Sequence, residues 1–158
     1  DVGLTGLWFD GQKYFARGLS NERIEQETSV LAEAKRWLDI YFAGKEPDFT
    51  PPLHPIGSAF RRSVWEILLQ IPYGQTATYG EIARQLAKKQ GLERMSAQAV
   101  GGAVGHNEIS IIIPCHRVVG ADGSLTGYAG GIDKKEALLE LERADMSRFF
   151  VPKKGTAL

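Results

Sequence analysis

Three neighbouring side chains in the second half of the chain have the types and spacing that nucleophilic chemistry needs. The only cysteine of the 158 residues, Cys115, follows the largely apolar run 109–113 and Pro114, and His116 and Arg117 come directly after it. A thiol is a good nucleophile as the thiolate, and neighbouring cations lower its pKa. A lone cysteine is also a common small residue of a core. The proline before it and the two protonatable groups after it favour a reactive thiol.

The composition limits the classes of protein that this sequence can encode. The chain has 19 basic and 19 acidic residues, so no global field attracts nucleic acid, although segment 61–118 holds seven basic against four acidic residues. One cysteine excludes an intramolecular disulfide and a multi-thiolate zinc site, and the three histidines show no metal-ligand spacing. We therefore expect no metal and no cofactor. No apolar stretch approaches the roughly 20 residues of a membrane span, which predicts a cytoplasmic protein without a membrane partner.

Residues 1–50 are predicted to form a small α/β domain. The aromatic-rich runs 4–9 and 13–16 flank Asp-Gly, which is typical of a β-hairpin. Residues 28–43 carry apolar side chains at helical spacing and end at a glycine, which predicts a helix that covers the sheet. Four prolines follow within residues 46–55 and disfavour both helix and central strand. We therefore place a linker at 51–57 and a second domain at 58–158.

Three helices are predicted at the start of this second domain. Ser58 is expected to cap a helix that ends before Pro72, and Thr78 with Glu81 forms a capping box that begins a second helix at Tyr79. The third, at 96–104, is almost without side chains because it contains two glycines and three alanines. Such a helix suits either tight helix packing or the recognition helix of a helix-turn-helix lying against nucleic acid. The pattern leaves both interpretations open.

The residues after the thin helix hold the candidate chemistry. Residues 109–113 are predicted to be a buried strand that leads to the cysteine, and residues 119–132, with five glycines, a loop that folds over something. A last helix is predicted at 133–146, with Asp133 as its N-cap and Glu136 as the partner in a capping box. Glu142 lies four residues after Leu138, on or beside the buried stripe, and a carboxylate there needs a partner.

Three stretches of the sequence together resemble the O6-alkylguanine-DNA alkyltransferases, also called methylated-DNA–protein-cysteine methyltransferases. They are Pro114-Cys115-His116-Arg117-Val118-Val119, the helix around 97–103 with Asn107, and Tyr128-Ala129-Gly130-Gly131. The resemblance covers essentially the whole chain. It implies an α/β N-terminal ribonuclease-H-like domain, here truncated by its first strands, and a mainly α C-terminal winged helix-turn-helix domain.

The resemblance also implies a function in DNA repair. The alkyl group of O6-alkylguanine, and of O4-alkylthymine, in double-stranded DNA is expected to move to Cys115 by SN2 attack of the thiolate after base flipping. A thioether has no easy leaving route, so each monomer is expected to act once and irreversibly. An alkylated base inside a duplex cannot be reached without extrusion of its nucleotide.

The resemblance assigns roles to individual residues of this sequence. Cys115 accepts the alkyl group, His116 is its base through a water, and Glu142 orients the imidazole. Asn107 links the recognition helix to the active site, while Tyr79 crowds the DNA phosphate and donates a proton to guanine N3. The expected DNA-contacting residues are Arg94, Ser96, Ala97, Gln98, Ala99, Gly101 and Arg117. The expected substrate pocket consists of Val118, Tyr128, Ala129, Gly130 and Gly131.

The sequence departs from the family pattern at two points and is also compatible with two rival functions. Gln98 occupies the position where many members have an arginine that replaces the flipped base, and the zinc-binding set of some relatives is absent. One rival is a cysteine hydrolase with a triad of Cys115, His116 and Glu142, which turns over repeatedly. The other is a lesion-binding module without catalysis. Cys115 speaks against that module because the alkyltransferase-like proteins lack the cysteine.

Overall fold

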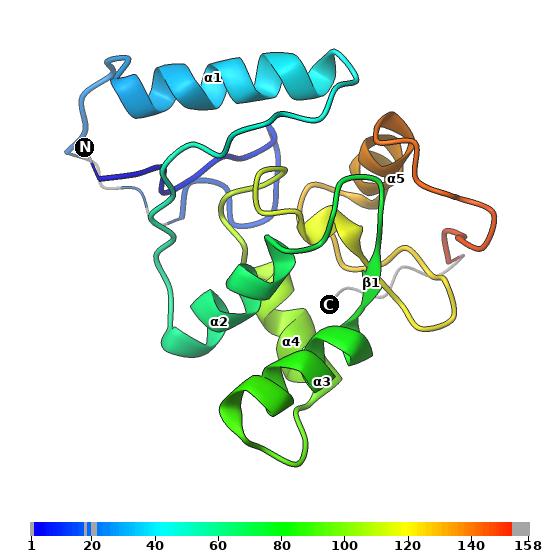
Figure 1. Cartoon of the computed structure of the whole chain (residues 1–158). Coiled ribbons are helices and arrows are strands. Elements are labelled where there is room, and N and C mark those ends of the chain that lie inside the picture. Colours follow the sequence, from blue (N-terminus) through cyan, green and yellow to red (C-terminus); the bar gives the residue numbers. More distant parts are fainter. Residues whose placement is uncertain (1, 18, 20–21, 153–158) are drawn as a thin grey trace.

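A computed structural model describes residues 2–17, 19 and 22–152 of the chain. The elements in chain order are α1 (Ser29–Phe42), α2 (Ala59–Leu68), β1 (Ala77–Thr78), α3 (Tyr79–Gln90), α4 (Ala97–Gly105), the 3-10 turn η1 (Cys115–Arg117), β2 (Val118–Val119) and α5 (Ile132–Leu141). Helix α1 lies along one end of the molecule, whereas α2, α3 and α4 cluster at the other (Figure 1). Of the helices described, none has the length and apolar character needed to traverse a lipid bilayer.

Helices α2, α3 and α4 each begin directly after a residue whose side chain caps them, and the sequence predicted the caps of α2 and α3. The hydroxyls of Ser58, Thr78 and Ser96 each accept a hydrogen bond from the backbone N–H three residues on, at 3.1 to 3.2 Å. These bonds satisfy N–H groups that have no partner inside a helix. Helix α3 ends on Gly91 in the left-handed conformation with φ +69°, which glycine adopts at little cost. Local chemistry therefore fixes the helices that carry the second half of the molecule.

The N-terminal segment does not form the predicted hairpin. Residues 10–11 and 13–17 lie in turns, and in the described part of residues 2–55 strand contacts occur only as isolated bridges. Leu4 pairs in parallel with Leu53, and Leu7 pairs in parallel with Ile109. A two-stranded hairpin alone is marginally stable in water. The segment instead gains its partners, and the burial of Leu4, from distant parts of the chain.

The predicted strand at 109–113 is a series of tight turns. The Ile112 N–H donates to the Ser110 carbonyl at 2.8 Å, and the Ile113 N–H donates to the Ile109 carbonyl at 3.2 Å. Ile111 has φ +72°, a left-handed conformation that is strained for a β-branched side chain. The apolar side chains are buried as the sequence predicted. Periodicity alone could not show that the backbone reverses between them.

The last helix is shorter than predicted and starts earlier. Helix α5 begins at Ile132 after Gly131, whose φ is +102°, and no side chain caps it. Asp133, the predicted N-cap, lies inside the first turn, so the predicted capping box does not form at that register. An acidic side chain in the first turn still complements the helix dipole. The helix ends at Leu141, which makes Glu142 its C-terminal cap.

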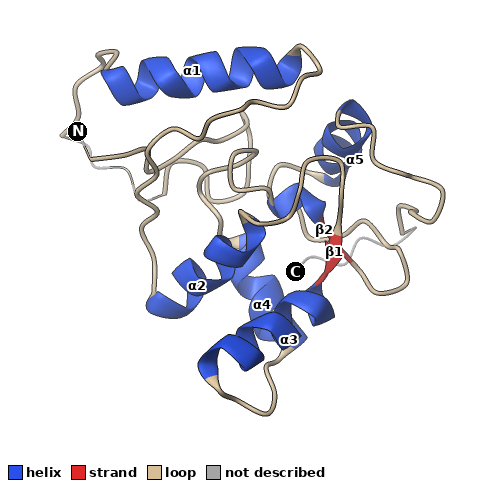
Figure 2. Ribbon diagram, in the orientation of Figure 1, coloured by secondary structure: helices blue, strands red, loops and turns tan. Residues whose placement is uncertain are grey.

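One hydrophobic core joins the parts of the chain on both sides of the proline-rich stretch. It contains Val30, Trp37 and Tyr41 of α1 together with side chains of α2, α3 and α4 and Cys115. The indole N–H of Trp65 donates to the Ala103 carbonyl at 2.9 Å and ties α2 to α4. Strands β1 and β2 form a short parallel pair, Ala77 with Val118 and Thr78 with Val119 (Figure 2). This pair holds η1, and thus the cysteine, against the helical cluster.

Candidate functional site

Cys115 begins η1 at the end of the turn-rich segment and is 4% exposed. The side-chain amide of Asn107 donates to its Sγ at 3.3 Å. The same Nδ2 donates to the carbonyls of Ile109 and Ile113 at 3.2 and 3.0 Å, and Oδ1 accepts from the Ile109 N–H at 2.9 Å. One buried amide thus holds the tight turns and the sulfur together. This geometry supports the placement of Asn107 between α4 and the thiol.

The electrostatics of the thiol differ from the expectation based on its sequence neighbours. Burial raises the pKa of Cys115 above its ordinary value of 9.0, whereas the Asn107 hydrogen bond and the charge of Lys135 lower it. The cation that favours the thiolate is therefore Lys135, which lies 20 positions along the chain. Because burial prevails, Cys115 is a thiol at neutral pH and needs a proton acceptor to react.

His116 and Glu142 form a buried pair. His116 Nε2 lies 2.6 Å from Glu142 Oε2, and both side chains are fully buried. Burial lowers the pKa of His116 below 6.5, although the Glu142 hydrogen bond and charge act in the opposite direction. The neutral imidazole therefore carries its proton on Nε2 and donates it to the carboxylate. Its other nitrogen, Nδ1, has no hydrogen-bond partner among the described residues and is the atom able to accept a proton.

The Glu142 carboxylate accepts hydrogen bonds from groups far apart in the sequence. Oε1 accepts from the Gly74 N–H at 3.0 Å and from Arg117 Nε at 2.8 Å. Oε2 accepts from Arg117 Nη2 at 3.0 Å and from the Tyr41 hydroxyl at 2.6 Å, in addition to His116. Burial alone raises the pKa of Glu142, but the hydrogen bonds from His116 and Arg117 outweigh it and hold the pKa at about 2. The carboxylate is ionised throughout the neutral range.

Arg117 does not lie where a DNA contact would require it. Arg117 is 8% exposed, and Nη1 donates to the Ile71 carbonyl at 2.7 Å while Nε and Nη2 donate to Glu142. This placement corrects the expectation that Arg117 touches DNA. A guanidinium with a bidentate carboxylate partner is fixed and neutralised in place, so Arg117 is a structural counter-ion of the His116–Glu142 pair.

A second polar cluster lies near the thiol. The sequence predicted one of its members, Tyr79, as a site residue but did not predict the other, Lys135. The hydroxyl of Tyr79 donates to the Thr126 carbonyl at 3.1 Å, and Nζ of Lys135 donates to the same oxygen at 2.6 Å. Burial raises the pKa of Tyr79 to about 12 and lowers that of Lys135 to about 8. Lys135 lies on the same helical stripe as Leu138 and Glu142, three and seven residues on, so the spacing that exposed Glu142 as unusual would also have identified this lysine.

The predicted pocket residues lie around His116 and the N-terminal segment. The ring of Tyr128 meets those of His116 and Phe9 edge to face, at centroid distances of 6.4 and 6.1 Å. A Cβ at Gly130 would come within 2.9 Å of the Tyr128 ring and 2.7 Å of the Phe9 ring, so this position needs glycine. Val118 is fully buried in β2. The Ala129 carbonyl accepts a hydrogen bond from the Lys13 backbone N–H. Gly131 directly precedes α5.

The predicted DNA-contacting residues divide into two groups. Arg94, Ser96, Ala97, Gln98 and Ala99 are all exposed at the start of α4. A groove of about 510 Å³ between α3 and this turn is lined by Arg84, Lys88, Arg94 and Ala97 among others. Gly101 is buried, contrary to expectation, whereas a Cβ on Gly102 would meet nothing within 4 Å. The open side of the thin helix is thus the side of Gly102.

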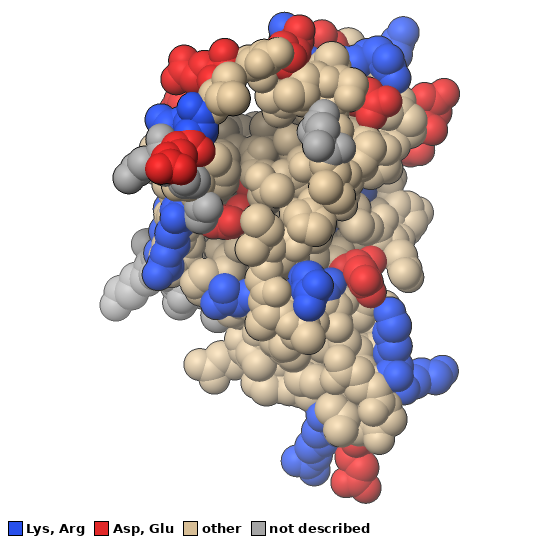
Figure 3. Space-filling view, turned by 90° about the vertical axis from the view of Figure 1, so that its left-hand side faces the viewer, with Lys and Arg blue, Asp and Glu red and all other residues tan. Residues whose placement is uncertain are grey.

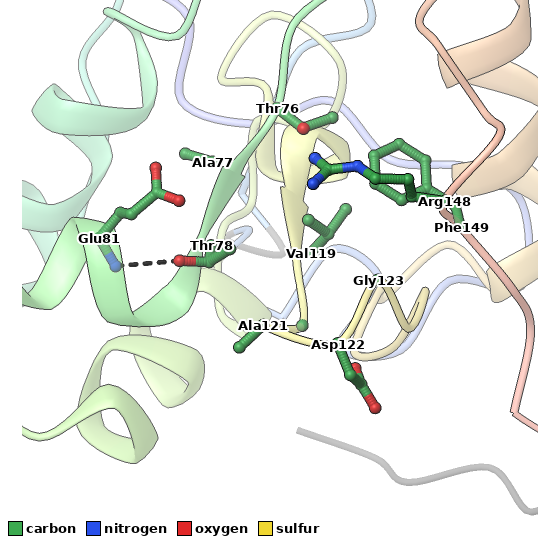
Figure 4. A pocket seen from close by; sticks show the side chains of 11 residues that line it. Thr76, Ala77, Thr78, Glu81, Val119, Ala121, Asp122, Gly123, Arg148 and Phe149 are labelled. Carbon is green, nitrogen blue, oxygen red and sulfur yellow. Dashed lines mark hydrogen bonds between the residues drawn. The ribbon is translucent and has the colours of Figure 1, made fainter.

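Charge is unevenly placed over the face shown in Figure 3. Acidic side chains on this face lie mostly around the end that holds α1, and basic side chains predominate at the opposite end, which holds α3 and α4. A separate pocket of about 240 Å³ beside the β1–β2 pair is lined by Thr76, Thr78, Asp122 and Arg148, and not by Cys115 (Figure 4). The described residues contain no cluster of three His, Cys, Asp or Glu side chains suited to a metal ion.

Comparisons with known proteins identify the family of both halves of the chain. Family models described as the ribonuclease-like domain and the DNA binding domain of 6-O-methylguanine DNA methyltransferase match residues 1–55 and 59–144. The methylated-DNA–protein-cysteine methyltransferases of Methanosarcina acetivorans and Mycobacterium bovis are 45% and 52% identical, over 84% and 71% of this chain and 86% and 67% of theirs.

A solved structure supports the same relationship in three dimensions. The crystal structure of Mycobacterium tuberculosis OGT in complex with DNA matches 94% of this chain and 83% of that chain, with 44% identity and a TM-score of 0.75. Both halves of the chain are therefore accounted for by one family, with a buried cysteine, a histidine–carboxylate pair and an exposed first turn of α4 in one molecule. The chain belongs to the methylated-DNA–protein-cysteine methyltransferase family.

Proposed function

We propose that this protein repairs DNA by moving the alkyl group of O6-alkylguanine, and of O4-alkylthymine, to Cys115. The observation that carries the proposal is the buried thiol of Cys115, followed directly in the chain by a neutral imidazole whose Nε2 is paired with an ionised carboxylate. Membership in the methyltransferase family indicates that the substrate of this site is alkylated DNA. No step in the transfer requires a metal ion or a cofactor.

The transfer balances as one displacement and two proton movements. The thiol proton of Cys115 passes through a water molecule to Nδ1 of His116, and Glu142 stabilises the imidazolium that forms. The thiolate then attacks the alkyl carbon, an S–C bond forms, the C–O6 bond breaks, and its electron pair stays on the guanine. In the second proton movement Tyr79 protonates the guanine, and the proton held on His116 is relayed through water to the Tyr79 oxygen, so that the thiol proton is accounted for. A thioether results, and the protein is consumed after one reaction.

Two groups beside the thiol serve this step. Lys135 is fully buried and its charge favours the thiolate, so we assign it the stabilisation of the attacking sulfur. Tyr79 is assigned the proton for guanine N3. A hydroxyl has one hydrogen, and that of Tyr79 is donated to the Thr126 carbonyl. Tyr79 must therefore turn from this carbonyl when a guanine enters, so that the loop around Thr126 and the substrate compete for one donor.

The exposed first turn of α4 is the part that we place against the duplex. Helices α3 and α4, with the connection 91–96 between them, form the helix-turn-helix of the proposed winged domain, for which 51–57 is the proposed boundary. Residues 96–99 are exposed at the N-terminus of α4, where the positive end of the helix dipole suits a phosphate. Gln98 is exposed and is assigned the space of the flipped nucleotide.

The decisive experiment follows a label from DNA to protein. Duplex DNA carrying radiolabelled O6-methylguanine is incubated with the protein, and labelled protein is counted against total protein. We expect the label to plateau at one equivalent on Cys115. Release of label with repeated turnover would indicate a hydrolase, and binding without transfer would indicate a lesion-binding module.

A matched variant makes this test specific to the thiol. Cys115→Ser is expected to bind the duplex normally and to transfer no label, because a hydroxyl is a poor nucleophile at neutral pH and the duplex-binding residues are elsewhere. Transfer by the serine variant would disprove the assignment of Cys115.

A further inference from the structure

One tyrosine of the N-terminal half reaches the carboxylate of the active site. Tyr41 lies near the end of α1, is fully buried, and is separated from Glu142 by 101 residues. Its hydroxyl donates to Glu142 Oε2 at 2.6 Å and lies 3.5 Å from His116 Nε2. The oxygen that accepts from Tyr41 is also the oxygen that accepts from His116. The hydroxyl thus meets the pair at the atom through which the two partners interact.

Contacts with neighbouring aromatic rings fix the orientation of the Tyr41 ring and therefore the position of its hydroxyl. It stacks on Trp37 of the same helix at a centroid distance of 5.2 Å and an angle of 10°. It also meets the rings of Tyr73 and His116 edge to face, at 6.1 and 6.5 Å. None of these contacts needs the hydroxyl. A phenylalanine could therefore keep the packing of α1 while the hydrogen bond is removed.

A hydrogen-bond donor at Oε2 changes how strongly the carboxylate stabilises a protonated His116. Every hydrogen bond that this oxygen accepts reduces the negative charge that stabilises a proton on His116. A hydrogen bond from a neutral hydroxyl to an ionised carboxylate is shorter and stronger than one between two neutral groups. Loss of the Tyr41 donation leaves more charge for His116 and makes its imidazole more basic. Other ionisable groups around the pair are Arg117 and Cys115 of η1, Lys135 of α5, Tyr73 and Tyr128.

We propose that Tyr41 is a positioning residue through which α1 sets the basicity of His116 in the alkyl-transfer reaction. The N-terminal half then contributes to the chemistry as well as to the core, because it supplies one of the donors to Glu142. This inference rests on the proposed function of Cys115 and His116, but it makes a separate statement about the pH at which they work. Tyr41 touches neither the thiol nor the alkyl group in this assignment.

The test is the pH dependence of single-turnover transfer in Tyr41→Phe. The free base O6-benzylguanine serves as the substrate, so that DNA binding does not enter the rate. A base must be unprotonated to act, so the rate falls on the acid side as His116 becomes protonated. We expect this acid limb to move to higher pH by about one unit in Tyr41→Phe, since one unit corresponds to about the strength of one such hydrogen bond. At a fixed pH on that limb the rate then falls by about tenfold.

Tyr73→Phe is the matched control. The ring of Tyr73 packs on Tyr41, and its hydroxyl has no hydrogen-bond partner among the described residues. The same atom is removed from a neighbouring ring without a change in the donors of Glu142. We expect its acid limb to coincide with that of the wild-type protein. A shift of equal size in both variants would show a general effect of lost hydroxyls and would overturn the proposal.

A second substitution tests the opposite direction and does not depend on the folding of Tyr41→Phe. Tyr41→3-fluorotyrosine keeps the ring and makes the hydroxyl a stronger donor, so the acid limb should move to lower pH. An unchanged limb in both Tyr41 variants, or a loss of rate that is equal at all pH values, would exclude the positioning role. Absence of transfer in the wild-type protein would contradict the proposed function instead.

Discussion

The surroundings of Glu142 and the first turn of α4 are built in opposite ways. Glu142 is 2% exposed and accepts hydrogen bonds from Tyr41, Gly74, His116 and Arg117, which come from three separate parts of the chain. The first turn of α4 is exposed from Ser96 to Ala99, and its one side-chain bond is the local cap from Ser96. Long-range contacts thus hold the chemistry in place, whereas the proposed DNA-facing surface depends on local structure.

This difference predicts where substitutions are costly. A change among the donors of Glu142 leaves the remaining buried polar groups without a partner and affects both stability and rate. A change on the exposed turn leaves the fold intact and affects the encounter with DNA alone. Predictions at three positions, Glu142, Lys135 and Gln98, test this separation of stability and chemistry from binding.

Glu142→Gln is expected to have the largest effect, on stability and on rate together. The glutamine amide carries no charge to neutralise Arg117, and its NH2 group would face hydrogen-bond donors that now bind a carboxylate oxygen. The free energy of unfolding at pH 7 should therefore fall by about 3–5 kcal/mol. Transfer by the folded fraction should slow by about a hundredfold because the imidazolium loses its counter-charge. Denaturant unfolding and single-turnover transfer measure the two effects. Glu140→Gln, an exposed change on α5, is the control and should alter neither.

The stability loss in Glu142→Gln should also depend on pH. The folded pKa of about 2 is below the ordinary value of 4.5, so the carboxylate stabilises the fold fully above pH 4.5. This contribution is lost as the pH falls towards 2. The difference in unfolding free energy between the wild-type protein and Glu142→Gln should therefore shrink over this range. A difference that stays constant down to pH 2 would mean that the charge of Glu142 does not stabilise the fold.

The two regions also differ in how well the sequence predicted them. The caps at Ser58, Thr78 and Ser96 depend on residues three positions apart, and the sequence identified two of them and the thin helix that follows the third. The donors of Glu142 depend on tertiary contacts across up to 101 residues. Tyr41 was covered only by the prediction of an apolar helix face within residues 28–43, and Arg117 was predicted as a DNA contact. Composition and periodicity cannot predict which buried polar atoms meet.

The prediction of a strand before the cysteine was wrong for a related reason. The run 109–113 has the apolar composition of a buried strand, yet Asn107 folds it into turns by bonding to the carbonyls of Ile109 and Ile113. The predicted hairpin failed because residues 4 and 7 pair with distant segments at Leu53 and Ile109. A side chain just before the run thus decided the backbone in the first case, and distant segments of the chain decided it in the second.

Lys135→Met tests the second buried polar cluster and should have an intermediate effect. Removal of the cation should slow transfer by about tenfold, as a change of one unit in the pKa of the thiol would do. Burial lowers the pKa of Lys135 to about 8, so the lysine is charged below this pH and neutral above it. The wild-type rate should therefore lose its Lys135-dependent enhancement as the pH rises through about 8, and the methionine variant should show no such loss.

The control for this lysine is its neighbour. Lys134→Met removes the same charge from a side chain that is 48% exposed and paired with Asp133 at 3.5 Å. Salt and solvent screen such an exposed charge, so we expect the transfer rate and its pH profile to remain unchanged. Equal effects of both lysines would mean that net charge, and not the buried position beside the thiol, determines the rate.

Gln98 provides the smallest expected effect and the sharpest test of the exposed turn. Gln98 is exposed in the first turn of α4, two residues after the Ser96 cap. Gln98→Ala should therefore leave stability and transfer to the free base O6-benzylguanine unchanged, while it slows repair of the same lesion in duplex DNA by about tenfold. The free base needs no extrusion, so only the duplex reaction includes the few kcal/mol of unpairing that an inserted side chain offsets. Gln26→Ala, an exposed change before α1, controls for the loss of a glutamine.

The reverse change at this position separates charge from shape. Gln98→Arg adds a cation to the exposed turn, so duplex binding should tighten and its logarithmic salt dependence should steepen by about one. Stability and the free-base reaction should again stay unchanged, because the buried donors of Glu142 are untouched. If Gln98→Ala instead slowed both substrates equally, Gln98 would support the pocket or the fold. The separation between a buried site for chemistry and an exposed turn for binding would then fail at the residue where it should be clearest.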